Sequence, residues 1–163
     1  KMKNKNLSFM TQAAMIAAIY VVLTYIFAPF SFGEVQVRIS EALTILPIFT
    51  PAAIPGLFAG CLIGNILGGA ILPDIVFGSI ATLIGAFFTW KLREQKPVVA
   101  TFPPIISNII IVPFVLRYGY GVTLPIPFMM LTVGIGEVIS CTVLGLIVYG
   151  ALKKYKSTLF RTA

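Results

Sequence analysis

The chain has 163 residues, of which 58% are hydrophobic and 10% are charged, and it contains no histidine. A soluble domain of this size cannot cover so much apolar surface, so the composition excludes one and indicates an integral membrane protein with room for about five to seven helices. The net charge of +7 does not indicate a nucleic-acid partner, because every lysine and arginine except Arg38 and Arg117 lies in a clump at the start, the middle or the end of the chain.

The first apolar run, residues 8–28, follows the basic start and is expected to form the first span. It is too long for a cleaved signal peptide and lacks a small-residue cleavage pattern. Its alanines form two pairs with a spacing of four, Ala13 with Ala17 and Ala14 with Ala18. Each pair therefore lies on one helix face, which permits close packing either within a bundle or against a partner protein.

The next two apolar runs, residues 40–50 and 52–69, are separated by a proline-flanked turn and are predicted to form a hairpin. The first arm is short for a span, so it is expected to be tilted or to cross the membrane only in part. The second arm carries a glycine at every fourth position, at Gly56, Gly60, Gly64 and Gly68. Bare backbone along one face predicts the close approach of a neighbouring helix of the same bundle.

Three further apolar runs, residues 74–92, 98–117 and 128–152, complete six predicted spans. We therefore expect an all-α, six-helix membrane bundle that forms a single domain over residues 1–163. An even number of spans puts both termini and all three basic clumps on one side, which the positive-inside rule identifies as the cytoplasmic side of the cell membrane. The outer loops are then residues 31–38, 69–73 and 118–127.

Several kinds of site are excluded by what the sequence lacks. Cys61 and Cys141 lie in apolar runs and are expected to pack rather than to form a disulfide. Without histidine, two isolated cysteines predict neither a zinc cluster nor an imidazole base. No Gly-x-x-x-x-Gly-Lys-Ser/Thr loop is present, so an ATPase of that type would have to be a partner. We predict no catalytic residue, no metal and no cofactor.

Polar residues in the outer half of the bundle or at its outer rim are the candidates for a binding site. A carboxylate in the hydrocarbon costs about 2.5–3.5 kcal/mol unless it is paired or hydrated, so Glu137 is expected to face a cavity or a partner. Carboxylates and amides around an aromatic wall suit a planar, nitrogen-rich solute. The candidate binding residues are Phe32, Gln36, Arg38, Glu41, Asn65, Asp74, Asn108 and Glu137.

Structural roles are the alternatives for three of these acids. Glu41 and Glu137 would stabilise the bundle if they paired with Arg38 or Arg117. Asp74, directly after a proline, is explained equally well as a helix N-cap or first-turn anion. The sequence leaves these alternatives open.

A family resemblance covers nearly the whole chain. The segments FGEVQVRISEALTILPIFTPAAIPGLFAGCLIGN (residues 32–65) and LPDIVFGSIATL (residues 72–83) resemble the QueT family. The Ser107-Asn108 pair and the VGIGE run at residues 133–137 resemble it as well. Members of this family are substrate-binding (S) components of energy-coupling factor (ECF) transporters, associated with queuosine precursors.

The resemblance implies a six-helix S-component bundle that binds a vitamin-like solute from outside. It implies partners as well: a transmembrane coupling (T) protein, docked through the alanine motif of the first helix, and two ATPase subunits. The implied solute is a 7-deazaguanine such as preQ1, preQ0 or queuine. One carboxylate, Glu41 or Glu137, would hold its guanine-like edge, and the sequence does not say which acid takes which end.

Three other functions remain to be compared with this one. An S component for a different vitamin-like solute and a self-sufficient facilitator would both use a polar site inside a membrane bundle. A membrane enzyme acting on a lipid-borne substrate is disfavoured, because the chain lacks histidine, a metal cluster and acids on the cytoplasmic side of the spans.

Overall fold

The computed structural model describes residues 2–27 and 39–155. Every regular element in these residues is helical, which confirms the all-α prediction. The elements are α1 (Met2–Ile26), the 3₁₀-helix η1 (Ile39–Ile48), α3 (Ala53–Leu67), α4 (Leu72–Lys91), α5 (Pro97–Ala100), α6 (Phe102–Tyr118), α7 (Ile126–Glu137), the π-helix η2 (Val138–Leu144), α8 (Gly145–Leu152) and the short 3₁₀-helix η3 (Lys153–Tyr155).

Within the described residues, four helical stretches are long and apolar enough to cross a membrane, and two apolar helices are shorter. The long ones are Asn6–Ile26, Leu72–Lys91, Pro97–Tyr118 and Ile126–Tyr155, and the shorter ones are Ile39–Ile48 and Ala53–Leu67. The chain is thus a multi-pass membrane protein, and both arms of the predicted hairpin are the short elements. With 15 residues, α3 is roughly 22 Å long, less than the hydrocarbon thickness of about 30 Å.

Local sequence explains where the helices end or change. α3 stops before Gly69, which adopts a left-handed φ of 79° and so terminates the helix at little cost. The predicted span 98–117 is divided at Thr101 into α5 and α6. Pro103 and Pro104 follow that break, and neither can donate a backbone hydrogen bond.

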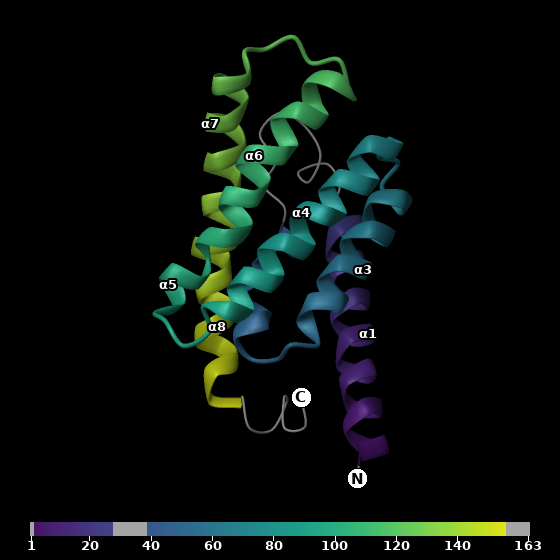
Figure 1. Ribbon diagram of the computed structural model, residues 1–163, viewed down its shortest axis with the longest axis vertical. Helices are drawn as coiled ribbons and strands as arrows, with labels where there is room; N and C mark the ends of the chain where they lie inside the picture. Colours follow the sequence, from purple (N-terminus) through teal and green to yellow (C-terminus); the bar gives the residue numbers. More distant parts are fainter. Residues whose placement is uncertain (1, 28–38, 156–163) are drawn as a thin grey trace.

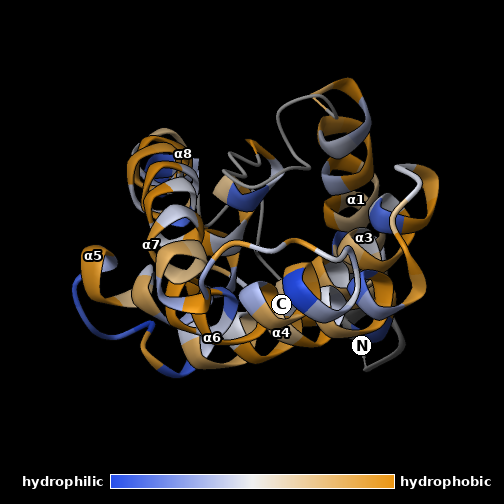
Figure 2. Ribbon diagram, turned by 90° about the horizontal axis from the view of Figure 1, so that it is seen from above, coloured by the Kyte–Doolittle hydropathy of each residue, from blue (hydrophilic) through white to orange (hydrophobic). Residues whose placement is uncertain are grey.

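The helices form three sides of a bundle around η1. α1 packs on α3, α3 on α4, α4 on α6 and α6 on α7. The continuous α7–η2–α8 rod and the α1–α3 pair lie on opposite sides, and α4 and α6 cross between them (Figure 1). Seen from above, hydrophobic residues dominate these helices (Figure 2). η1 contacts α1, α3, α4, α8 and η2. Its buried residues, which include Glu41, therefore lie in the middle of the molecule.

The predicted glycine packing is confirmed at the α1–α3 contact. A methyl group at Gly56 would lie 2.8 Å from the carbonyl oxygen of Ala13, and one at Gly60 would lie 2.8 Å from Cβ of Tyr20. Real side chains do not approach so closely, so only glycine permits this helix separation. A buried apolar cluster that includes Tyr20, Leu46 and Leu57 then joins α1, η1 and α3.

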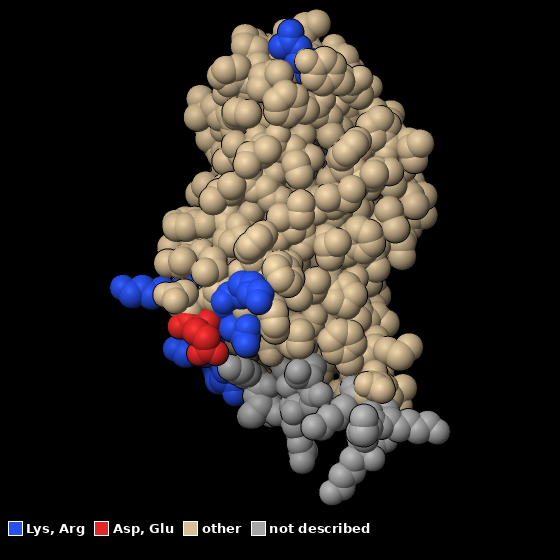
Figure 3. All heavy atoms as spheres, viewed as in Figure 1, with Lys and Arg blue, Asp and Glu red and all other residues tan. Residues whose placement is uncertain are grey.

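Most charged side chains gather at one end of the molecule. Lys91 ends α4, Lys96 precedes α5 and Lys153 follows α8. These three helix ends and the beginning of α1 lie at the lower end in Figure 1. The space-filling view has blue atoms concentrated at that end and a small group at the opposite end (Figure 3). This is the charge asymmetry on which the positive-inside argument depends.

Candidate functional site

The first acid is held by an unusual helix. Glu41 lies on η1, a 3₁₀-helix of 10 residues that contains Pro47, although 3₁₀ runs longer than three or four residues are uncommon. With three residues per turn, Glu41, Thr44 and Pro47 lie in one row, and all three are buried. The Thr44 hydroxyl donates to the carbonyl of Glu41 at 2.6 Å. The central position of η1 thereby places a carboxyl group inside the bundle.

The second acid lies where an α-helix becomes a π-helix. Glu137 is the last residue of α7, and the π-helical η2 begins at Val138 and contains Cys141. Glu137 is 4% exposed and Cys141 is fully buried. Short π-helical stretches occur frequently at functional sites because they displace side chains from the regular helical register. η2 packs against η1, so the two acids are carried by the two irregular helices that meet.

Five side chains make what we call the acid cluster: Tyr20, Glu41, Asn108, Glu137 and Cys141. The amide Nδ2 of Asn108 donates to Oε2 of Glu137 at 3.0 Å. The Tyr20 hydroxyl donates to Oε1 of Glu41 at 3.0 Å. The thiol of Cys141 lies between the acids, 3.2 Å from Oε2 of Glu137 and 3.8 Å from Oε2 of Glu41. The structure thus brings together Glu41, Asn108 and Glu137, which the sequence predicted to share one site.

The acid cluster can bind a group that donates several hydrogen bonds or carries positive charge. Glu41, Glu137 and Cys141 each offer one atom that could bind a metal ion, and these atoms lie within 4.8 Å of one another. Two carboxylates and a thiol are a poor match for a structural zinc site, which uses four cysteine or histidine ligands. Paired N–H groups or an ammonium group suit the carboxylates, because charge-assisted hydrogen bonds are the strongest available.

Ion pairing with Arg117 does not explain the acids. Between residues of the ranges 6–27 and 39–155, the structure shows one ion pair, which joins Arg93 to Glu94 at 4.0 Å on the exposed surface and includes neither buried glutamate. Phe32, Gln36 and Arg38, which the sequence also predicted for the site, lie outside the described residues. The alternative that depends on Arg38 therefore stays a prediction.

Asp74 and Asn65 take part in a second polar group, at the end of the molecule opposite the basic residues. The Tyr120 hydroxyl donates to Oδ2 of Asp74 at 2.6 Å and accepts from the backbone N–H of Ile71 at 3.4 Å. The amide of Asn65 donates to the carbonyl of Asp74 at 3.5 Å. We call Asn65, Asp74 and Tyr120 the rim group. Its bonds join the segment after α6 to the α3–α4 connection, and none of them reaches the acid cluster.

The predicted docking alanines divide between two faces of α1. Ala13 and Ala17 are half-buried beside the glycines of α3, whereas Ala14 and Ala18 are exposed. Met15 and Val22 are also exposed, at 59% and 53%. The open face of α1 thus contains one alanine pair and several large apolar side chains.

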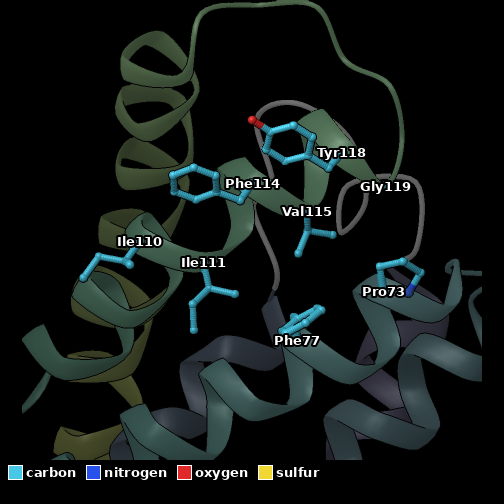
Figure 4. Close-up of a pocket in the computed structure, with 8 residues that line it drawn as sticks. All are labelled: Pro73, Phe77, Ile110, Ile111, Phe114, Val115, Tyr118 and Gly119. Carbon is cyan, nitrogen blue, oxygen red and sulfur yellow. The ribbon is translucent and has the colours of Figure 1, made fainter.

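A hollow of about 530 Å³ lies between α4 and α6, and none of the described residues that line it is a predicted binding residue. Figure 4 shows apolar side chains of both helices around it. The residues that line it are Pro73, Phe77, Ile110, Ile111, Phe114, Val115, Tyr118 and Gly119. This lining offers few polar partners, so it does not suit the nitrogen-rich solute expected from the acids.

The sequence analysis missed Tyr20 and Cys141 as members of the acid cluster. Tyrosine in membrane helices usually lies at the interface, so Tyr20 in the middle of a predicted span was a signal of a buried polar partner. Cys141 follows Glu137 by four residues, a spacing that places two side chains on one helix face. Both signals were present, but neither says which distant residue is the partner.

Comparison with known proteins gives a consistent result. The family described as QueT transporter matches residues 10–154 of the chain. One relative, the "Queuosine precursor transporter QueT" of Lactococcus lactis subsp. cremoris (strain MG1363), is 33% identical over 84 residues. The matched part covers 50% of this chain and 48% of that relative, so it spans about half of each protein. No solved structure matches the chain.

Proposed function

Because the chain belongs to the QueT transporter family, we propose that it is the substrate-binding membrane subunit of an ECF-type importer and captures a queuosine precursor. The similarity to the queuosine precursor transporter of L. lactis supports the class of solute. The observation that carries the proposal is the acid cluster, where Glu41, Asn108 and Glu137 meet from η1, α6 and α7. Buried acids are costly in a membrane protein and are functional candidates by default.

The chemistry of a 7-deazaguanine matches these groups. Its guanine-like edge presents an N–H and an NH₂ side by side, and one carboxylate can accept both. The aminomethyl group of preQ1 is a cation, for which a second carboxylate is the natural partner. Glu41 and Glu137 would then hold opposite ends of one solute, and Asn108 would orient Glu137 and the ring.

The remaining parts of the proposal concern topology and partners. The six apolar segments would form an S-component bundle in the cell membrane, with the basic end and both termini in the cytoplasm. Solute would enter from the opposite end. The T protein would dock on α1 through Ala14 and Ala18 on its open face, with Ala13 and Ala17 supporting that face from the α3 side. Two ATPase subunits would supply the energy, and the chain itself would be no enzyme.

Binding to the purified protein tests the proposal directly. We expect preQ1, preQ0 or queuine to bind the detergent-purified chain without partners, as measured by isothermal titration calorimetry. E41Q and E137Q should each weaken binding by about tenfold or more, because each loses a charge-assisted hydrogen-bond acceptor. E94Q is the control, since Glu94 is 86% exposed beside Arg93. A folded chain that binds none of the three precursors contradicts the proposal.

Uptake by liposomes separates an importer subunit from a self-sufficient facilitator. A subunit should bind solute but give no sustained flux until the T protein, the ATPases and ATP are added. Sustained flux with the chain alone would favour the facilitator.

A further inference from the structure

Helix α1 is bonded to the segment that carries Glu41 at three levels. The Thr50 hydroxyl donates to Oε1 of Gln12 at 2.9 Å, Tyr20 donates to Glu41 at 3.0 Å, and the Thr24 hydroxyl donates to that of Ser40 at 2.9 Å. Residues 12, 20 and 24 are separated by multiples of four, so they lie along one face of α1. Of these three contacts, the one made by Tyr20 reaches a carboxylate of the acid cluster.

Packing fixes Tyr20 in this position. The side chain is 1% exposed, and Gly60 leaves no space beside it, because a methyl group there would lie 2.8 Å from Tyr20 Cβ. A buried phenol is costly unless its hydroxyl has a partner. Glu41 supplies that partner, so the place of α1 and the place of the Glu41 carboxylate depend on each other.

The contact also determines how Glu41 is turned. Oε1 of Glu41 accepts from Tyr20, while Oε2 lies 3.8 Å from the Cys141 thiol, which in turn donates to Glu137. Tyr20 therefore holds one oxygen on the α1 side and directs the other toward the second acid. A carboxylate that is held in place loses less freedom when it binds a solute.

From these contacts we infer that Tyr20 is a positioning residue that orients Glu41 for the solute and links occupation of the acid cluster to helix α1. The inference rests on the proposed function of the acid cluster. Linkage is reciprocal, so a solute bound at Glu41 stabilises the contact between α1 and η1, and displacement of α1 weakens solute binding. The opposite side of α1 is its open face, so the Tyr20–Glu41 hydrogen bond connects the acid cluster to a helix that is exposed on its other side.

Y20F tests the inference, with T24V as its matched control. Y20F keeps the ring and removes the hydroxyl, so it should weaken deazapurine binding by about tenfold. T24V removes a buried hydrogen bond between the same two elements without touching an acid, and it should change the affinity by less than about twofold while lowering thermal stability about as much as Y20F.

Hydrogen exchange is a second measurement, because a purely structural role of Tyr20 would not change how bound solute affects amide exchange in α1. In the unsubstituted chain and in T24V, saturating solute should slow exchange of the amides in residues 16–26. In Y20F, solute bound to the same saturation should leave that exchange nearly unchanged. Equal protection in Y20F and T24V would overturn the link to α1.

If Y20F does not fold, a pair of glycine variants decides. G60A pushes on Tyr20 Cβ, whereas in G64A the added methyl lies 3.4 Å from the nearest atoms of Thr24. G60A should weaken binding and G64A should not, and native affinity in folded G60A overturns the inference.

If the unsubstituted chain binds no precursor, the proposed function fails and the inference with it. If it binds and Y20F binds as tightly, the inference alone fails.

Discussion

The same chemical pair, a tyrosine hydroxyl and a carboxylate, occurs in two regions of this protein with different surroundings. In the acid cluster, Tyr20 donates to Glu41 at 3.0 Å, and both residues are at most 2% exposed. In the rim group, Tyr120 donates to Asp74 at 2.6 Å, and Tyr120 is 41% exposed. The pairs differ in what else the carboxylate meets.

The surroundings explain why one pair suits a binding site and the other a structural joint. Glu41 lies beside a thiol and a second acid that come from a distant part of the chain. The Asp74 carboxylate accepts from Tyr120, and the Asn65 amide donates to the backbone carbonyl of Asp74. The Tyr120 hydroxyl bonds to both Asp74 and the backbone of Ile71. It thereby links the segment after α6 to the α3–α4 connection. Two buried carboxylates close together favour a solute that donates hydrogen bonds through N–H groups.

The largest expected effect comes from removing both acids of the cluster. The double variant E41Q/E137Q should lose binding of all three deazapurines by at least about a hundredfold, because two charge-assisted acceptors are lost together. The matching change at the rim, D74N, should alter affinity by less than about threefold. Calorimetry on both proteins at equal concentration measures the difference. If D74N binds as poorly as the double variant, the rim group belongs to the binding site.

Sequence reasoning could identify the class of fold and the acids. The all-α class, the glycine packing at Gly56 and Gly60 and the gathering of basic residues at one end depend on neighbours in the sequence or on solvent, and these predictions agree with the structure. Of the six predicted spans, four correspond to helical stretches of the described residues that are long and apolar enough to cross a membrane. Glu41, Asn108 and Glu137 were predicted together because polar groups at similar depth in a membrane must find one another. The bounds of the spans agree less well: α3 has 15 residues and is one of the two shorter apolar helices of the described residues, and Gly69 follows its end.

Other features could not be predicted because they depend on contacts between distant elements. The 3₁₀ form of η1 and the π form of η2 are less favourable than an α-helix for an isolated chain, so packing of the two against each other has to stabilise them. The roles of Tyr20, Tyr120 and Cys141 follow from which element each one faces. Asp74 and Asn65 are an acid and an amide in apolar segments, as are Glu41 and Asn108. The sequence therefore does not distinguish the two pairs, and only the fold places them in separate groups.

The two buried amides offer a finer comparison. N108L removes the donor to Oε2 of Glu137 and leaves a buried carboxylate with one partner fewer, so binding should weaken by about tenfold. N65L removes a donor to a backbone carbonyl at the rim and should cost about 1 kcal/mol of stability with affinity nearly unchanged. Calorimetry and thermal unfolding of both variants measure the two effects. Equal losses of affinity would show that the two polar groups act as one site.

The smallest effect is expected at the rim hydroxyl. Y120F removes the bonds to Asp74 and Ile71 and should lower the free energy of unfolding by about 1 kcal/mol, since the pair is partly exposed to water. Solute affinity should stay within about twofold, while the amides of residues 119–124 exchange faster. Hydrogen exchange followed by mass spectrometry measures this locally. F114L on the neighbouring surface of α6 is the control for a general loosening of that end. An affinity loss in Y120F as large as in Y20F would mean that the joint between the connections controls the acid cluster, and the distinction between the two regions would disappear.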